Sequence, residues 1–134
     1  MNNVYVFDTN VLVSALLFAN SLPRKALELA LDRGKTLISK ETVDELNNVL
    51  SRPKFKRYIS PQKRERFLFS FIQKSVLIEI QEKIEECRDP KDNKFLELAV
   101  NGEATTIVSG DKDLLVLHPF REISIVTVSQ FLDS

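Results

Sequence analysis

The sequence predicts an α/β fold in which helices cover a central parallel β-sheet. Three observations support this prediction. Short β-rich runs alternate with longer stretches of helical periodicity, most of the short runs are apolar on both faces, and no repeat or linker interrupts the alternation. The chain has 134 residues, 43% of them hydrophobic, which is enough for one domain with a substantial core and too little for two. We therefore expect a single domain over residues 1–134.

The expected strands share a run of β-branched and other apolar residues. They are Val4–Phe7, Thr36–Ile38, Val76–Ile80, Thr106–Val108 and Ile123–Thr127. Between them, apolar residues recur three and four positions apart, as on the buried face of an amphipathic helix. These helical stripes are Ala26, Leu27, Ala30 and Leu31; Val43, Leu46 and Leu50; Leu68, Phe71 and Ile72; and Phe95, Leu96 and Ala99. A further helix is expected from about Val11 to Phe18.

Capping residues mark where several helices begin. Ser39 precedes the predicted helix Lys40–Ser51, whereas Ser60 and Asp89 each stand directly before a proline, the favoured residue of a first helical turn. Only the segment Pro53–Ile59 is expected to be irregular.

Composition narrows the classes of function. The 19 basic and 19 acidic residues cancel, so the net charge indicates no particular partner. The only cysteine, Cys87, excludes an internal disulfide and a multi-cysteine zinc site. No apolar run reaches the roughly 18 residues of a membrane span, and no signal peptide is recognisable. We expect a cytoplasmic protein without a membrane partner.

A carboxylate stands in the apolar stretch "YVFDTNVLVSALL", residues 5–17. A buried, ionised and unpaired Asp8 would cost several kcal/mol. In open parallel sheets, polar ligands bind at the carboxyl ends of the strands. Asp8 follows the first predicted strand and Asp111 follows the fourth, so both should lie at that edge. The simpler interpretation is that Asp8 and Asn10 cap a helix, and that Asp111 and Asp113 are turn residues.

Two further acids are expected at the same edge. Asp92 begins a predicted helix on the side that faces the sheet, and Glu45 lies in the second turn of the helix after the second strand. Alternatively, Asp92 completes a capping arrangement opened by Asp89, and Glu45 is an ordinary exposed helical residue paired with Glu41. If the four acids converge with no lysine or histidine beside them in the cluster, their carboxylates repel one another. Mg²⁺ or Mn²⁺ would relieve their repulsion and support metal-assisted phosphoryl transfer, with one or two ions.

These residues resemble a known family, the PIN-domain ribonucleases, and in particular the small prokaryotic toxins of toxin–antitoxin pairs. The resemblance runs through "VFDTNVLVSALL", "ETVDELNNVLSRPKFKRYIS", "DPKDNKFLELAV" and "IVSGDKDLL". It implies a three-layer fold with strand order 3-2-1-4-5, RNA as substrate and an antitoxin protein as partner. It also implies a catalytic metal site formed by four acids, which are Asp8, Glu45, Asp92 and Asp111. Asp113 would be an accessory metal ligand, and Asn10 and Ser109 would hydrogen-bond into the site.

A basic segment lies between the second and the third helical stripe. Between residues 52 and 66, seven basic residues stand against Glu65 alone, a net charge of +6. Phe55 and Tyr58 are interleaved with them, a mixture typical of single-stranded RNA binding. The basic residues are Arg52, Lys54, Lys56, Arg57, Lys63, Arg64 and Arg66, and all but the last are predicted to bind RNA. The alternative is a solvated linker whose aromatic side chains pack inward.

Other enzyme classes fail at particular residues. A haloacid-dehalogenase-type phosphatase needs a second Asp where this chain has Asn10, and a ribonuclease with a histidine pair is excluded because His118 is the only histidine. The remaining alternative is a PIN-like module that binds RNA or protein without cleaving it. We therefore predict an Mg²⁺- or Mn²⁺-dependent ribonuclease. The target RNA, endo- or exonuclease action, the antitoxin and whether the chain forms a homodimer stay open.

Overall fold

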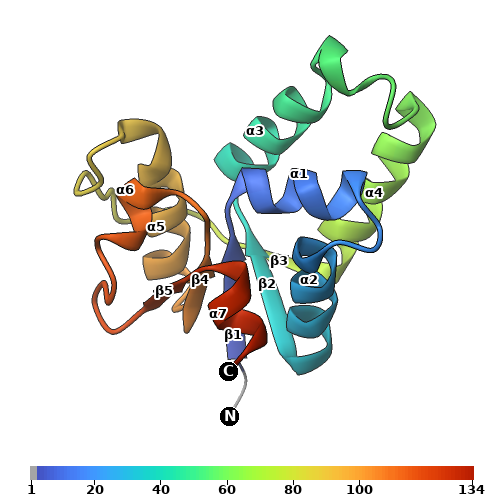
Figure 1. Cartoon of the computed structure of the whole chain (residues 1–134). Helices are drawn as coiled ribbons and strands as arrows, with labels where there is room; N and C mark the ends of the chain where they lie inside the picture. The colour runs from blue at the N-terminus through green and yellow to red at the C-terminus, as the bar shows by residue number, and fades with distance from the viewer. Residues whose placement is uncertain (1–2) are drawn as a thin grey trace.

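A computed structural model describes residues 3–134 and contains one parallel five-stranded sheet (Figure 1). The strands are β1 (Asn3–Phe7), β2 (Gly34–Ile38), β3 (Ser75–Leu77), β4 (Thr106–Val108) and β5 (Ser124–Val126). Their order is β3-β2-β1-β4-β5, and every neighbouring pair is parallel. The predicted fold class and strand order are confirmed. Because β1 and β4 are central neighbours, the residues that follow them lie side by side.

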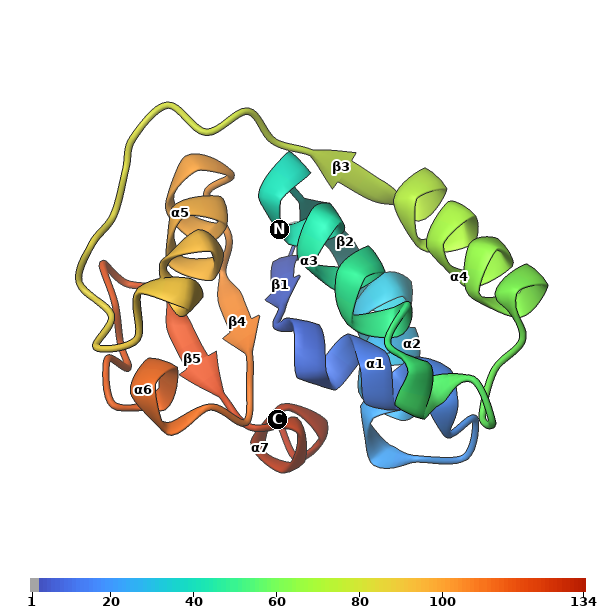
Figure 2. The same ribbon diagram turned by 90° about the horizontal axis from the view of Figure 1, so that it is seen from above.

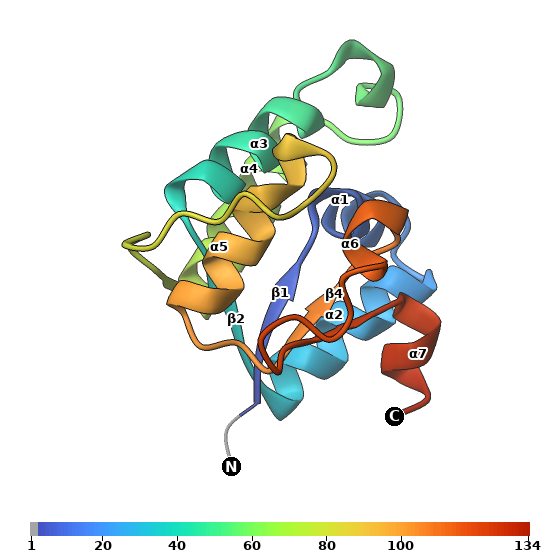
Figure 3. The same ribbon diagram turned by 90° about the vertical axis from the view of Figure 1, so that its left-hand side faces the viewer.

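Helices cover both faces of the sheet (Figure 2). One face packs against α1 (Thr9–Leu17), α2 (Leu22–Arg33), α3 (Lys40–Leu50), α4 (Pro61–Lys74) and α7 (Val128–Leu132). The other face packs against α5 (Asn93–Asn101) and α6 (Lys112–Leu115), which lie nearest the viewer in Figure 3. Two short 3₁₀ turns, η1 (Pro53–Phe55) and η2 (Pro90–Asp92), complete the elements.

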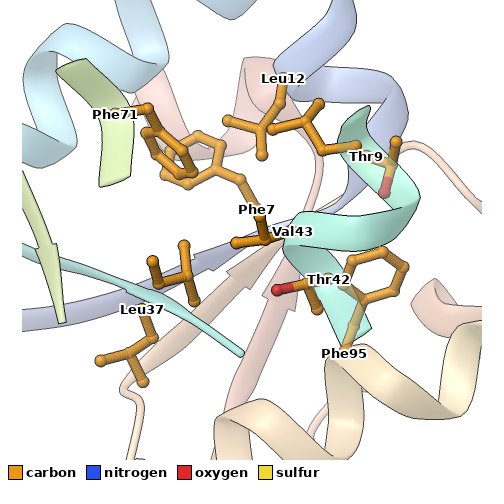
Figure 4. A pocket seen from close by; sticks show the side chains of 10 residues that line it. Phe7, Thr9, Leu12, Leu37, Thr42, Val43, Phe71 and Phe95 are labelled. Atoms are coloured by element: carbon orange, nitrogen blue, oxygen red, sulfur yellow. The ribbon is translucent and has the colours of Figure 1, made fainter. Parts of the chain in front are cut away.

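The core consists of two apolar clusters, one on each side of the sheet. Alternation along β1 feeds both, since Tyr5 and Phe7 join the cluster with α1 to α4 and Val6 joins the cluster with α5. Figure 4 shows Phe7 surrounded by apolar side chains from α1, α3 and α4. The cavity there is about 10 Å³, close to the lower limit of about 10–15 Å³ for a single water. This interior is therefore packing and has no room for a substrate.

Side-chain caps begin the helices at the predicted residues. Ser39 accepts a hydrogen bond from the Thr42 amide, and the Thr42 hydroxyl accepts one from the Ser39 amide, which completes a capping box. Ser60 caps α4, and Asp89 caps η2 through the Lys91 amide. Each of these capping side chains satisfies a backbone amide that the first helical turn leaves unpaired.

The structure differs from the predicted elements at several boundaries. The third strand ends at Leu77 rather than at residue 80, because Leu77 pairs with Ile38, the last residue of β2. The fifth strand ends one residue early because Thr127 caps α7. Neither α6 nor α7 was predicted, since helices of four and five residues are too short to show periodicity. The segment predicted to be irregular contains the single turn η1.

Within residues 3–134, no helix combines the length and the apolar character that crossing a membrane would require.

Candidate metal centre

The carboxyl ends of β1 and β4 bring Asp8, Ser109 and Asp111 together. Phe7 and Val108 are paired residues of the two strands, and the Asp8 amide extends the ladder by donating to the Val108 carbonyl at 3.1 Å. Ser109 lies next to Asp8 across the strands and donates its hydroxyl hydrogen bond to Asp8 Oδ2. The same hydroxyl oxygen accepts from the Asp111 amide at 2.9 Å. Ser109 therefore holds the two acids in a fixed relation.

Asp8 is buried, with 4% of its surface exposed. Its Oδ1 accepts a hydrogen bond from the Val11 amide at 2.9 Å and so caps α1. Burial raises the pKa of Asp8, and the nearby Asp111 raises it further, whereas polar contacts with Ser109, Val11 and Gly110 lower it. Capping and a site role thus coexist in one side chain, because the two carboxylate oxygens point to different partners.

Asp111 and Asp113 are turn residues that also face the site. Asp111 Oδ1 accepts from the Asp113 amide at 2.8 Å and caps α6. This bond uses the backbone of Asp113, so its carboxylate is free to lie beside other acids. Turn formation and clustering of the two acids are therefore compatible.

Asp92 is the most perturbed acid of the group. It ends η2 and precedes α5 without making a capping hydrogen bond, and its Oδ2 is buried and accepts no hydrogen bond from any donor of residues 3–134. Burial, then the neighbouring carboxyl of Asp111, then the charges of Asp89 and Asp8 raise the pKa of Asp92 to about 7. Asp89 caps η2 by accepting from the Lys91 amide, but within residues 3–134 the Asp92 side chain makes no capping hydrogen bond, so Asp92 does not complete that capping arrangement.

Asp89 is a site residue that sequence reasoning missed. Carboxylate oxygens of Asp89, Asp92 and Asp113 lie within 4.8 Å of one another. A 3₁₀ helix has about three residues per turn, so Asp89 and Asp92 fall on the same side of η2. The spacing of three was visible in the sequence, but it was assigned to capping alone.

A polar stripe on α5 positions the chain that leads to Asp89. Asn93, Glu97 and Asn101 are spaced four residues apart, and each accepts hydrogen bonds from backbone amides of residues 81–87. Asn93 accepts from the Cys87 amide at 2.9 Å, and the Cys87 thiol donates to the Asp113 carbonyl at 3.4 Å. Asp89 is therefore held two residues beyond a segment that is fastened to both α5 and α6.

Glu45 does not stand free of basic residues, and this part of the sequence reasoning was wrong. Lys94 Nζ on α5 forms an ion pair with Glu45 Oε2 at 2.5 Å, and both side chains are half-buried. Lys94 lies two residues after Asp92, so Glu45 is linked to the start of α5. The two residues are 49 positions apart in the sequence, so the ion pair can be recognised only when the relative positions of α3 and α5 are known.

The two predicted supporting residues behave differently. Ser109 hydrogen-bonds into the site as described, whereas in the described chain no hydrogen bond joins Asn10 to the acids. Asn10 is instead exposed on α1, where it lines a groove.

The donor set fits a hard divalent cation. Five aspartates gather here, and within residues 3–134 no lysine, arginine or histidine forms a salt bridge with any of them. They are Asp8, Asp89, Asp92, Asp111 and Asp113. Such oxygen ligands suit Mg²⁺ or Mn²⁺. The buried Asp92 Oδ2 is an acceptor that a cation would satisfy.

Comparison with known proteins gives the family. The sequence model that defines the PIN domain family matches residues 4–113 of this chain. The chain belongs to the PIN domain family. The predicted family is thereby confirmed, and membership supports a hydrolytic nuclease. An uncharacterized protein of Methanocaldococcus jannaschii is 35% identical over 115 residues, which cover 84% of this chain and 74% of the relative.

Two solved structures share the PIN fold. VapBC2 from Rickettsia felis, solved bound to a DNA fragment from its promoter, matches with a TM-score of 0.64 and 17% identity, covering 92% of this chain and 98% of that one. PAE2754 from Pyrobaculum aerophilum matches with a TM-score of 0.63 and 14% identity, covering 98% and 88%. At these identities the likeness concerns the fold.

The basic segment of this PIN domain joins α3 to α4 and continues into α4. Six of its seven basic residues are exposed, Arg64 is half-buried, and none forms a salt bridge in the described part of the chain. Phe55 packs against the core, whereas Tyr58 is exposed. The inward-packing alternative therefore holds for one aromatic residue and not for the other.

The raised pKa of Asp92 predicts how metal-free stability depends on pH. A carboxyl with a folded pKa of about 7 and an unfolded pKa of about 4 contributes stability that is fully present below pH 4 and lost as pH rises through 7. Asp92→Asn should therefore flatten the decline in melting temperature between pH 4.5 and 8 in the presence of a chelator. Asp32→Asn, at an exposed position of α2, is the control and should keep the wild-type slope. A wild-type slope in Asp92→Asn would contradict the assignment.

A pair of substitutions separates capping from charge at Asp8. Asn retains the cap and removes the buried charge, so the metal-free Asp8→Asn protein should be at least as stable as the wild type. Asp8→Ala loses the cap, which costs about 1 kcal/mol, or roughly 4 °C in melting temperature. Mg²⁺ or Mn²⁺ should raise the melting temperature of the wild type and much less that of either variant. If Asp8→Asn lowered metal-free stability by several degrees, Asp8 would be chiefly structural.

Proposed function

We propose that this PIN domain is a metal-dependent ribonuclease that hydrolyses phosphodiester bonds of RNA. The observation that carries the proposal is the gathering of aspartates around the buried, unpartnered Asp92 Oδ2, without a basic side chain to neutralise them. Membership of the PIN family supports the same class of reaction. The ions proposed are Mg²⁺ or Mn²⁺, and the proposed catalytic ligands are Asp8, Glu45, Asp92 and Asp111, with Asp113 accessory.

When bound, a divalent ion would acidify a water and neutralise charge on the phosphate. The chain's own residues prepare the site for it. Ser109 fixes Asp8 and Asp111 at the ends of adjacent strands, so two acceptors need no reorganisation. Lys94 keeps Glu45 beside the start of α5 and neutralises it. The pKa of Asp92 is raised to about 7, so near neutral pH a proton on this carboxyl limits repulsion in the metal-free protein.

The basic segment is the proposed RNA-binding surface. Its cations are free of acidic partners in the described chain, so they can neutralise phosphates without first breaking ion pairs. The proposed contacts are Arg52, Lys54, Lys56, Arg57, Lys63 and Arg64.

We further propose that the protein is the toxin of a toxin–antitoxin pair and that a cognate antitoxin restrains it. The proposal is supported by sequence resemblance and by the shared fold with VapBC2 of Rickettsia felis. The alternative is a PIN-like module that binds RNA or protein without cleaving it, and it is tested with the same proteins.

Cleavage of labelled RNA should require Mn²⁺ or Mg²⁺ and each of the four proposed catalytic ligands. Asp8→Asn, Glu45→Gln, Asp92→Asn and Asp111→Asn should each lower kcat/KM on the order of 100-fold or more, because each removes a proposed ligand charge. Glu41→Gln, on the same helix as Glu45 and exposed, should retain activity. RNA that is bound but uncut at every metal concentration would favour the non-cleaving module.

Charge reversal tests the RNA-binding surface. Changing Lys54, Lys56, Arg57 and Arg64 to Glu should weaken RNA binding and make its dependence on salt shallower, since fewer counterions are released. Metal affinity, measured by calorimetry, should stay nearly unchanged. Lys35→Glu, at the amino end of β2, is the control and should bind RNA like the wild type. An unchanged salt slope in the quadruple variant would assign the segment to solubility or a protein partner.

A further inference from the structure

We infer that a groove between α1 and the basic segment binds a nucleobase of the RNA strand, one that neighbours the cleaved bond. The inference rests on the proposed function for its substrate, and it adds a base-binding subsite outside the metal centre. We call this feature the α1 groove, defined by Asn10, Val13, Phe18, Lys54, Arg57 and Tyr58 among its lining residues.

The α1 groove follows one face of a single helix. One wall comes from α1 and its C-cap Phe18, at positions 10, 13, 14, 17 and 18, the i, i+3, i+4, i+7, i+8 pattern of one helical face. The opposite wall comes from Lys54, Phe55, Arg57 and Tyr58, in the connection between α3 and α4 that Figure 1 shows above α1. The open cavity between them is about 480 Å³, within the size range of pockets that hold small ligands.

Two exposed aromatic rings form the far end of the groove. Phe18 is 51% exposed and Tyr58 is 53% exposed, and their centroids lie 6.1 Å apart in an edge-to-face arrangement. In this arrangement the ring that presents its edge keeps both faces free of its neighbour. Nucleobases stack on such faces whatever their sequence. Tyr58 was predicted from the sequence to take part in RNA binding, but Phe18 was not, since its partner is 40 residues away.

Cations beside the rings favour an anionic strand over an apolar peptide. Arg57 lies over the Tyr58 ring at 5.7 Å, and Lys54 lies over the Phe55 ring at 5.1 Å. Both basic side chains are exposed and unpaired in the described chain, so they can contact the phosphates on either side of a stacked base. Among the described residues 3–134, none that lines the groove is acidic.

The groove begins two residues beyond Asp8 along the chain. Asp8 caps α1 through the Val11 amide, Asn10 lines the near end of the groove, and Phe18 stands eight residues after Asn10, or about 12 Å at 1.5 Å per residue. A strand whose phosphate lies at the aspartates therefore reaches Phe18 and Tyr58 with a neighbouring base rather than with the one at the cleaved bond.

The test asks whether the two rings and one base of the RNA contribute to binding through the same contact. Binding of a short fluorescent RNA is measured by anisotropy with the Asp8→Asn protein in chelator, while a single abasic nucleotide is scanned along the RNA. At one position, loss of the base should weaken binding about 5- to 100-fold, the range expected for one stacked base. The variant that adds Phe18→Leu and Tyr58→Leu should bind intact RNA more weakly by a similar factor, and should lose no further affinity at that abasic position.

Three controls keep the result specific. Tyr58→Phe keeps the ring and should bind like the parent protein. Phe69→Leu removes a 65% exposed ring on α4, away from the groove, and should also bind like the parent. Both substituted groove side chains are exposed, so thermal melts should stay near those of the parent.

If the loss from the abasic nucleotide and the loss from the two substitutions were additive at every position, the inference would be overturned. An RNA affinity unchanged by Phe18→Leu and Tyr58→Leu would also overturn it, and would assign the groove to a protein partner. Cleavage of the same RNA by the unsubstituted protein is measured in parallel. If the abasic position is coupled to the two rings but the RNA is not cleaved, the base subsite is supported and the proposed ribonuclease is rejected. If the RNA is cleaved but no position is coupled to the rings, the ribonuclease is supported and the base subsite is rejected.

Discussion

Asp8 carries a carboxylate at a place where almost no solvent reaches it, and the organisation of the site follows from how that charge is accommodated. A buried carboxylate needs hydrogen bonds, a cation or a proton. The Val11 amide and the Ser109 hydroxyl supply the hydrogen bonds. Val11 is a local partner, whereas Ser109 reaches Asp8 because β1 and β4 are paired in register at Phe7 and Val108. Strand pairing in the core therefore determines the geometry of the acids at the edge.

Asp111 and Asp89 are placed by hydrogen bonds with the backbone rather than by side-chain pairs of opposite charge. Asp111 caps α6, Asp89 caps η2, and the polar stripe of α5 fastens the segment before Asp89. Each anchoring bond occupies one carboxylate oxygen or none, which leaves the aspartates close together and mutually repelling. The fold thus holds carboxylate oxygens in fixed positions although they repel one another, as the raised pKa of Asp92 indicates.

What could be predicted from the sequence depended on local patterns. Buried strands, helix caps and the aspartates after β1 and β4 leave signals within a few residues, and the strand order followed from the resemblance. Asp89 and Lys94 were missed for a different reason: their roles arise from contacts with Asp113 and Glu45, which tertiary packing brings together. Phe18 was missed likewise, because an exposed aromatic residue has no distinctive sequence pattern until Tyr58 is placed beside it.

Helix α1 connects these features physically. Its first turn is capped by Asp8, its buried side packs against the sheet through Leu12 and Ala15, and its remaining face lines the α1 groove. A helix held at its N-terminus by a site residue and along its length by the core has little freedom to tilt. The distance between the aspartates and the two exposed rings is consequently set by the number of residues in α1. Any strand that occupies both places must then meet them at a spacing that the fold, rather than a flexible loop, determines.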